Sequence, residues 1–260
     1  MKRVVFHTDL DNTLIYSSRY ERKDHDLGKD LRCVEQYHEQ EASFITQKTY
    51  QLLRKVQEYA WIIPTTTRTK EQYQRIDLGI ELPYALVCNG GVLLREGRED
   101  EIWYQDSLEL IKSSRSELSK ALTFLEQERR RTFELRFIKE LFVFTKCKES
   151  ESVVENLKRI VEGTLVDVFY NGNKVYVVPK ALSKGKAVER FRKIISAECV
   201  IAAGDSAFDK TMLEAADYGI ATPQLAKQYS FAEHVKCPPS DMLYAEAVLH
   251  TVLGLCDGRQ

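Results

Sequence analysis

Residues 4–13, Val-Val-Phe-His-Thr-Asp-Leu-Asp-Asn-Thr, join a short apolar run to two aspartates that lie two positions apart. The apolar part has the length and composition of a buried strand, and this strand is expected to end at Asp9. In open parallel α/β sheets, ligands bind beyond the carboxyl ends of the strands. Asp9 and Asp11 are therefore predicted to stand at a ligand-binding edge of such a sheet.

Short apolar runs alternate with amphipathic helical patterns in both the first and the last third of the chain. This alternation is typical of a βα-repeating, mostly parallel sheet. In the first third we expect a helix at 46–59, a strand at 61–63, a helical stretch at 69–78 and a strand at 84–88. In the last third we expect helices at 184–195, 208–216 and 241–255, the last one capped by Ser240, and strands at 199–203, 218–221 and 235–237.

The middle of the chain has a different pattern. We expect a long helix at 107–129, strands at 133–138 and 141–145, a helix at 151–161, and strands at 165–170 and 174–178. The last two strands flank Asn171-Gly172, which is a strong hairpin signal. The predicted fold class is thus α/β, a Rossmann-like parallel-sheet core formed by residues 1–96 and 180–260, with an inserted α+β domain at 97–179.

Composition narrows the class of protein. The 260 residues contain 38 Lys and Arg against 39 Asp and Glu, a net charge of −1 that argues against a nucleic-acid partner. No apolar run reaches the ~18 residues of a membrane span. Six cysteines lie far apart without a CxxC pair, so free thiols and a cytoplasmic location are expected. The sequence carries no signal of oligomeric state.

Further polar residues follow the other predicted strands or begin helices, namely Thr66, Lys184, Asp205 and Asp209. Carboxylates that crowd together disfavour their own ionised forms. Mg²⁺, which prefers oxygen ligands, and a lysine are the usual means of neutralising them. One carboxylate can then attack phosphorus, and a second, two residues on, can protonate the leaving oxygen. The set therefore favours phosphoryl transfer.

These residues resemble the four motifs of the haloacid dehalogenase superfamily. Asp9-Leu10-Asp11-Asn12-Thr13 is similar to the first motif (DxDxT), and Thr66, Lys184 and Gly204-Asp205…Asp209 follow as the second, third and fourth in the family's order. The insertion between the second and third motifs resembles the C2-capped branch. That branch includes Cof-type and sucrose-phosphatase-like sugar phosphatases.

The resemblance implies a role for each matching residue. Asp9 is expected to be nucleophile and Mg²⁺ ligand, and Asp11 general acid and base, with its backbone carbonyl as a second ligand. Lys184 is expected to neutralise nucleophile and phosphate. Asp205 is expected to bind Mg²⁺ directly, and Asp209 to do so through water or to orient Lys184.

Other residues near these motifs are candidate ligands or departures from the pattern. Thr66 is expected to hold phosphate oxygens, and Asn89 of Asn89-Gly90-Gly91 is a further candidate. Relatives usually carry glycine at Thr67, so Thr67 competes with Thr66 for this role. They also usually carry asparagine where Phe208 stands, and the phenylalanine leaves the metal's surroundings less polar. At the position of Asn12 they more commonly carry glycine. Arg68 is a candidate substrate contact, and Lys186 is a rival for the role of Lys184.

A charged segment at about 17–44 separates the first motif from the first helix, where relatives of this branch have a short loop. Residues 33–44 alternate loosely, as in a β-hairpin. Because the segment leaves the sheet beside Asp9, it is either a flap that helps to close the site or a solvated excursion.

The sequence as a whole predicts a Mg²⁺-dependent phosphatase that hydrolyses a small phosphorylated metabolite, such as a sugar or polyol phosphate, through an aspartyl-phosphate. A phosphomutase with the same motifs is an alternative, which would return the phosphoryl group to the sugar. A non-catalytic ligand sensor on the same fold is another. The pair Asp9 and Asp11 argues against the sensor, because a binding module needs no nucleophile and acid.

Overall fold

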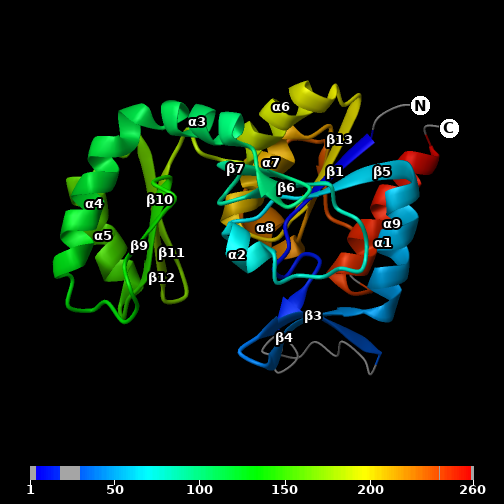
Figure 1. Ribbon diagram of the computed structural model, residues 1–260, viewed down its shortest axis with the longest axis horizontal. Helices are drawn as coiled ribbons and strands as arrows, with labels where there is room; N and C mark the ends of the chain where they lie inside the picture. The colour runs from blue at the N-terminus through cyan, green and yellow to red at the C-terminus, as the bar shows by residue number, and fades with distance from the viewer. Residues whose placement is uncertain (1–3, 18–29, 240, 259–260) are drawn as a thin grey trace. The chain divides into compact units, whose positions relative to one another are not determined.

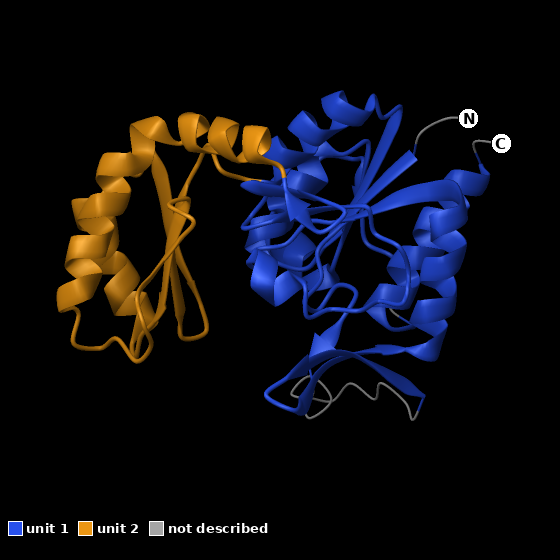
Figure 2. Cartoon of the chain, viewed as in Figure 1, with its two compact units in different colours: residues 1–99, 184–260 blue, residues 100–183 orange. Residues whose placement is uncertain are grey.

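The computed structural model describes residues 4–17, 30–239 and 241–258 (Figure 1). The chain divides into two compact units, which are coloured separately in Figure 2. Unit 1 comprises residues 1–99 and 184–260, and unit 2 comprises residues 100–183. These boundaries lie three and four residues beyond the limits at 96 and 179 that the sequence suggests.

A parallel sheet of five strands forms the centre of unit 1. Its order is β15 (Val235–Lys236), β14 (Tyr218–Ala221), β13 (Cys199–Gly204), β1 (Val4–Thr8) and β5 (Ala60–Pro64). The strand predicted from residues 4–8 thus lies between β13 and β5. This arrangement confirms the expected α/β class with a parallel sheet.

Helices cover both faces of this sheet (Figure 1). Side chains alternate along β1, so Phe6 joins a buried apolar cluster with α1 (Gln47–Tyr59) and α9 (Tyr244–Asp257). His7 points to the other face, where its ring meets Phe191 of α6 (Lys184–Ile195) edge-on at 5.6 Å. Burial on both faces explains why β1 reads as a continuous apolar run.

The strand expected at 84–88 does not join the parallel sheet as a full member. It forms β6 (Tyr84–Val87), which pairs antiparallel with β7 (Val92–Arg95), and β7 pairs with β8 (Arg98–Glu99). A single bridge from Thr65 to Leu86 links it to the end of β5. The tight turn after β6 explains the difference, because Cys88, Asn89 and Gly90 all have positive φ and reverse the chain at once.

A second small sheet consists of β2 (Tyr16–Ser17), β4 (Gln40–Thr46) and β3 (Leu31–Tyr37), paired antiparallel in that order. The β-hairpin expected at 33–44 is therefore present. The rest of the charged segment, residues 18–29, lies outside the described residues. At the end of β4, Thr46 caps α1 by accepting a hydrogen bond from the Thr49 amide at 2.9 Å.

Unit 2 contains helices and an antiparallel sheet. In chain order its elements are α3 (Glu101–Leu110), η1 (Lys112–Ser114), α4 (Arg115–Gln127), β9 (Arg136–Ile138), β10 (Phe142–Lys146), α5 (Ser150–Ile160), β11 (Val166–Asn171) and β12 (Lys174–Pro179). The sheet order is β11-β12-β10-β9. The hairpin at Asn171-Gly172 is confirmed, since Asn171 pairs with Lys174 and Gly172 has a φ of +59°. The predicted α+β insertion is confirmed.

The single helix expected at 107–129 is wrong. It is interrupted at Ile111, where ψ is 5°, and continues as α4 after a 3₁₀ turn. Serine competes with helical hydrogen bonding, and Ser114 Oγ donates instead to the carbonyl of Leu165 at 3.1 Å. That tertiary contact has no counterpart in the local sequence.

Smaller differences concern helix limits in unit 1. The structure has α2 (Lys70–Tyr73), η2 (Ala207–Asp209), α7 (Lys210–Ala215) and an unexpected α8 (Pro223–Gln228). The last helix begins at Tyr244 and not at 241, and Ser240, its expected cap, lies outside the described residues.

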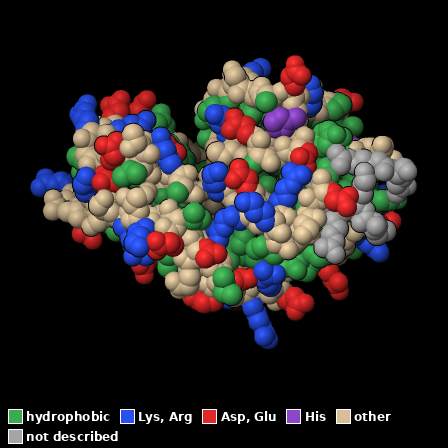
Figure 3. Space-filling view, turned by 90° about the horizontal axis from the view of Figure 1, so that it is seen from above, with side chains coloured by type: hydrophobic (Ala, Val, Ile, Leu, Met, Phe, Trp, Pro, Cys, Tyr) green, Lys and Arg blue, Asp and Glu red, His purple; other side chains and the backbone are tan. Residues whose placement is uncertain are grey.

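Side chains of both charge signs intermingle on the face drawn in Figure 3. Within the described ranges, every helix is too short or too polar to cross a membrane.

Candidate active site

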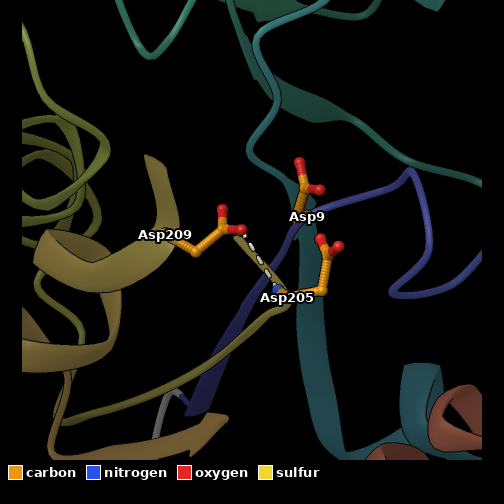
Figure 4. A group of neighbouring side chains, drawn as sticks. All are labelled: Asp9, Asp205 and Asp209. Carbon is orange, nitrogen blue, oxygen red and sulfur yellow. Dashed lines mark hydrogen bonds between the residues drawn. The ribbon is translucent and has the colours of Figure 1, made fainter. Parts of the chain in front are cut away.

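The first two carboxylates of the site follow neighbouring strands. Asp9 follows β1 and Asp205 follows β13, and the two strands pair in parallel so that Thr8 lies opposite Ala203. The Asp9 amide extends this ladder by donating to the Ala203 carbonyl at 2.9 Å. Register alone therefore brings Asp9 and Asp205 to the same edge of the sheet, as Figure 4 shows.

Asp209 reaches the same place from the following turn (Figure 4). Its Oδ2 accepts hydrogen bonds from the amides of Asp205 and Ser206, at 3.1 and 2.9 Å, and from Ser206 Oγ at 2.9 Å. This turn requires glycine at 204, because a Cβ there would lie 2.2 Å from the Cβ of Asp209. The Gly204-Asp205…Asp209 motif is thus one folded unit.

Lys184 opens α6 and lies in the middle of the carboxylates. Its side chain is 1% exposed, and Nζ donates to Asp9 Oδ1 at 2.6 Å and to Asp209 Oδ1 at 2.5 Å. The next residue, Gly185, allows α6 to approach α7, since a Cβ at 185 would meet the Thr211 carbonyl oxygen at 2.3 Å. Lys186, the rival lysine, is exposed and pairs with Glu189 on its own helix.

The charges in this group do not balance. Burial, opposed by Lys184, raises the pKa of Asp9 well above its ordinary value, and the neighbouring Asp209 and Asp205 raise it further. Burial and Asp209 also raise the pKa of Asp205 to about 7. Burial alone would lower the pKa of Lys184, but Asp209 and Asp9 raise it above its usual value, so the lysine stays charged. One lysine therefore does not neutralise three ionised carboxylates, and without a further cation Asp9 and Asp205 favour their protonated forms.

The residues fit a hard divalent cation. Asp9, Asp205 and Asp209 each offer a carboxylate oxygen within 4.8 Å of the others, and oxygen donors alone suit Mg²⁺. Thr13 Oγ1 donates to Asp205 Oδ1 at 3.3 Å and so helps to orient that carboxylate. Both oxygens of Asp209 already accept hydrogen bonds from Lys184 and the 205–206 turn, which suits an orienting role more than direct ligation.

Thr66 and Asn89, two of the predicted phosphate ligands, lie together at the end of β5. The Thr66 side chain is fully buried, and its Oγ1 accepts a hydrogen bond from the Arg68 amide at 3.2 Å. The Asn89 amide donates to the Thr66 carbonyl at 2.9 Å. Thr67, the competing threonine, is more exposed. Thr65, which sequence inspection passes over, is bound to Nδ1 of His7 at 2.9 Å and so belongs to the buried framework.

Asp11, the predicted general acid, is not in the carboxylate cluster. Its side chain is 51% exposed and forms a bidentate ion pair with Arg68, with Nε to Oδ2 at 2.8 Å and Nη2 to Oδ1 at 2.7 Å. Arg68, predicted as a substrate contact, thus binds a candidate catalytic side chain in this structure. Its Nη1 donates to Glu35 Oε1 at 2.8 Å.

Two residues beside the site were missed in the sequence. Glu35 of β3 is 5% exposed and is charged beside Arg68, although an acidic residue in a charged segment reads as solvated. Tyr244 is the other, and its buried hydroxyl lies 3.0 Å from the Gly204 carbonyl and 2.8 Å from that of Ile220. The sequence gives no specific signal for Tyr244, because the helix was expected to begin at 241 and not at this residue.

A family model for haloacid dehalogenase-like hydrolases matches residues 97–228, just over half of the 260-residue chain. The matched stretch contains Lys184, Asp205 and Asp209. A comparison with curated protein sequences gives no match.

Solved structures share the fold over nearly the whole chain at low identity. The sucrose-phosphatase of Synechocystis sp. PCC6803, in complex with sucrose and phosphate, has a TM-score of 0.64 at 18% identity and covers 99% of both chains. A trehalose-6-phosphate phosphatase related protein has a TM-score of 0.54 at 16% identity, covering 99% of this chain and 100% of its own.

A phosphatase of the same superfamily from Bacteroides thetaiotaomicron has a TM-score of 0.55 at 14% identity, covering 99% of this chain and 96% of its own. These likenesses agree with the parallel sheet, the inserted α+β unit and the family model. The chain belongs to the haloacid dehalogenase-like hydrolase family.

Proposed function

We propose that the protein is a Mg²⁺-dependent phosphatase that hydrolyses a small phosphorylated metabolite, most suitably a sugar or polyol phosphate. One observation carries the proposal: a buried lysine, Lys184, lies 2.6 Å from the carboxylate of Asp9 among three clustered carboxylates. Such a site suits a reaction in which an anion attacks a charged phosphoryl group, because positioning and charge neutralisation supply most of the rate.

In the proposed reaction, a carboxylate oxygen of Asp9 attacks phosphorus while the bond from phosphorus to the substrate's ester oxygen breaks. Asp11 transfers a proton to that oxygen, and the alcohol leaves. Asp11, now ionised, takes a proton from a water molecule that attacks the aspartyl-phosphate. The phosphorus–Asp9 bond breaks and inorganic phosphate leaves, which returns both aspartates to their starting forms.

The remaining residues hold charge and phosphate. Mg²⁺, when bound, would neutralise the carboxylates and the phosphate oxygens and so keep Asp9 ionised at neutral pH. We assign its ligands to the carboxylates of Asp9 and Asp205 and to the backbone carbonyl of Asp11. Asp209 would act through water or by orienting Lys184, whose charge faces both nucleophile and phosphate.

Thr66 is the preferred phosphate ligand, because its buried hydroxyl has a fixed partner in the Arg68 amide. We assign Asn89 beside it and Thr67 as a weaker contact. A hydroxyl that is already oriented loses little entropy when it donates to a phosphate oxygen.

The substrate class rests on similarity. Two of the solved structures that share the fold are described as a sucrose-phosphatase with bound sucrose and phosphate, and as a protein related to trehalose-6-phosphate phosphatase. We propose by analogy that a sugar phosphate is the substrate here. We also propose that unit 2, residues 100–183, serves as the substrate-selecting cap.

A cytoplasmic location fits this proposal. All six cysteines are free thiols, and four of them are buried, at Cys88, Cys147, Cys199 and Cys256. Chains with several unpaired thiols are typical of reducing compartments.

The test is phosphate release from p-nitrophenyl phosphate and a panel of sugar and polyol phosphates, with Mg²⁺ and with EDTA. Asp9→Asn should lower kcat at least about 1,000-fold, because the amide is no nucleophile for phosphorus. Asp241→Asn, an exposed aspartate of unit 1, is the matched control and should keep wild-type kcat.

Unchanged turnover by Asp9→Asn would refute the mechanism. A folded wild-type protein that releases no phosphate from any compound in the panel would refute the function. Isomerised sugar phosphate without net phosphate release would identify a phosphomutase instead.

A further inference from the structure

A line of alternating charges runs from the predicted general acid into the β3–β4 hairpin. Asp11 pairs with Arg68, and Arg68 pairs with Glu35 of β3 at 2.8 Å. The same oxygen of Glu35, Oε1, lies 3.2 Å from Arg75 Nε, and its other oxygen, Oε2, accepts a hydrogen bond from Ser43 Oγ at 2.6 Å. The acid of the proposed reaction is thereby connected to a hairpin that supplies none of the four family motifs.

Exposure along this line falls steeply away from the site. The side chain of Asp11 is 51% exposed, that of Arg68 13% and that of Glu35 5%. Arg68 gives Nε and Nη2 to Asp11, whereas Nη1 faces Glu35 and lies 3.5 Å from the Gln72 carbonyl. The guanidinium is thus held by Glu35 on its buried side, and Asp11 is its partner on the solvent side.

Glu35 is held in its ionised form and so can fix the position of the Arg68 guanidinium. Burial by itself would raise its pKa, but hydrogen bonds from Arg68 and Ser43 and the nearby charge of Arg75 lower it below the usual value. Oε1 of Glu35 faces both arginines and Oε2 accepts from Ser43, and a hydrogen bond between an ionised carboxylate and a charged donor is about twice as strong as a neutral one.

The hairpin holds Glu35 against the chain that follows β5. The pairing of β3 with β4 shifts register between Cys33 and Glu35 and again between Glu35 and Gln36. Glu35 also bridges to Ile76, and the Asp77 amide donates to the Val34 carbonyl at 2.8 Å. Bulges of this kind re-aim a side chain next to a functional site.

We infer that Glu35 is a positioning residue for the general acid: through Arg68 it gives the Asp11 carboxylate one defined resting place beside the phosphate site. This inference rests on the proposed phosphatase function. In the resting arrangement both oxygens of Asp11 accept hydrogen bonds from Arg68, so at least one oxygen must leave Arg68 and take up a proton from solvent before Asp11 can act as the acid. Arg68, kept by Glu35, stays behind when Asp11 turns to the substrate. Without Glu35, Arg68 follows Asp11 and the acid loses its fixed starting point.

The leaving group separates this role from a merely structural one. Nitrophenolate leaves without a proton, whereas the alkoxide of glycerol 2-phosphate needs one. The value of kcat/KM covers the steps up to release of the alcohol. The readout is therefore the ratio of kcat/KM for glycerol 2-phosphate to kcat/KM for p-nitrophenyl phosphate.

Glu35→Gln should lower this ratio about 10-fold, a part of the roughly 100-fold or more that general acid catalysis supplies. Ser43→Ala, which removes one hydrogen bond to Glu35, should lower it by a smaller factor and covers the case in which Glu35→Gln fails to fold. Glu41→Gln, an exposed glutamate of the same hairpin, is the matched control and should keep the wild-type ratio. In an Asp11→Asn background, Glu35→Gln should change the ratio no further.

A ratio that stays at the wild-type value or rises in Glu35→Gln overturns the inference, as does an equal fall for both substrates. A further fall in the Asp11→Asn background overturns it as well, because Glu35 would then act by another route. These results differ from failure of the proposed function, in which the wild-type protein itself hydrolyses neither substrate.

Discussion

Asp205→Asn should stabilise the metal-free protein while weakening its response to Mg²⁺. The folded protein holds the pKa of Asp205 at about 7, against an ordinary value of 3.8, because the group is buried beside Asp209. The folded state therefore binds this proton more tightly than the unfolded chain does. Stability of the metal-free wild type should fall as the pH rises from about 4 to about 7, and the loss should be complete above that range.

The size of the effect follows from the two pKa values. A difference of roughly 3 pKa units, at about 1.4 kcal/mol each, gives up to about 4 kcal/mol of destabilisation by ionised Asp205 at pH 8. The asparagine side chain has nearly the same shape and can still accept the hydrogen bond from Thr13. The variant should thus be more stable than the wild type by up to about 4 kcal/mol at pH 8, and by little at pH 4.

The measurement is urea unfolding followed by circular dichroism at pH 4 and pH 8, in EDTA and in Mg²⁺. Saturating Mg²⁺ should stabilise the wild type by about 2.7 kcal/mol at 100 times its Kd, and Asp205→Asn by much less. Asp241→Asn should stay within about 0.5 kcal/mol of the wild type at both pH values. The electrostatic argument is refuted if Asp205→Asn gains nothing at pH 8 in EDTA, or gains as much at pH 4.

Two further pairs of variants compare neighbouring residues. Lys184→Met should lower the free energy of unfolding by about 3–5 kcal/mol, because it leaves buried carboxylates without their cation. Lys186→Met should change it by less than about 1 kcal/mol. Thermal unfolding in EDTA measures both, and equal losses would contradict the assignment of Lys184. Thr66→Val should weaken competitive inhibition by inorganic phosphate about 10-fold, the worth of one hydrogen bond to a charged group, and Thr67→Val should weaken it less. Inhibition constants measure both, and a larger effect at Thr67 would exchange the two roles.

The local sequence pattern was sufficient to predict those helices and strands whose buried residues recur at the spacing of the element. The strand from Val4 to Thr8 and the helix over 184–195 were predictable because apolar residues recur at the spacing of the element. The meeting of Asp9 with Asp205 was predictable for the same reason, since both directly follow strands of one parallel sheet.

Contacts between distant segments were not predictable in this way. The interruption of the helix at Ile111 depends on a hydrogen bond from Ser114 to Leu165, fifty-one residues away. The reversal after β6 depends on three successive residues with positive φ, two of which, Cys88 and Asn89, carry side chains. Neither feature changes the local hydrophobic period from which elements are inferred.

The sequence by itself determined the α/β class, the inserted unit and the identity of the strand-end carboxylates, because these depend on periodicity and on the order of motifs. Only the tertiary structure decided which charges balance one another. It assigned Lys184 to both Asp9 and Asp209, and it joined Asp11 to Glu35 through Arg68. The physical reason is that ion pairing depends on distance and burial in three dimensions. The paired residues lie 25 to 175 positions apart, and the sequence alone does not show which of them are partners.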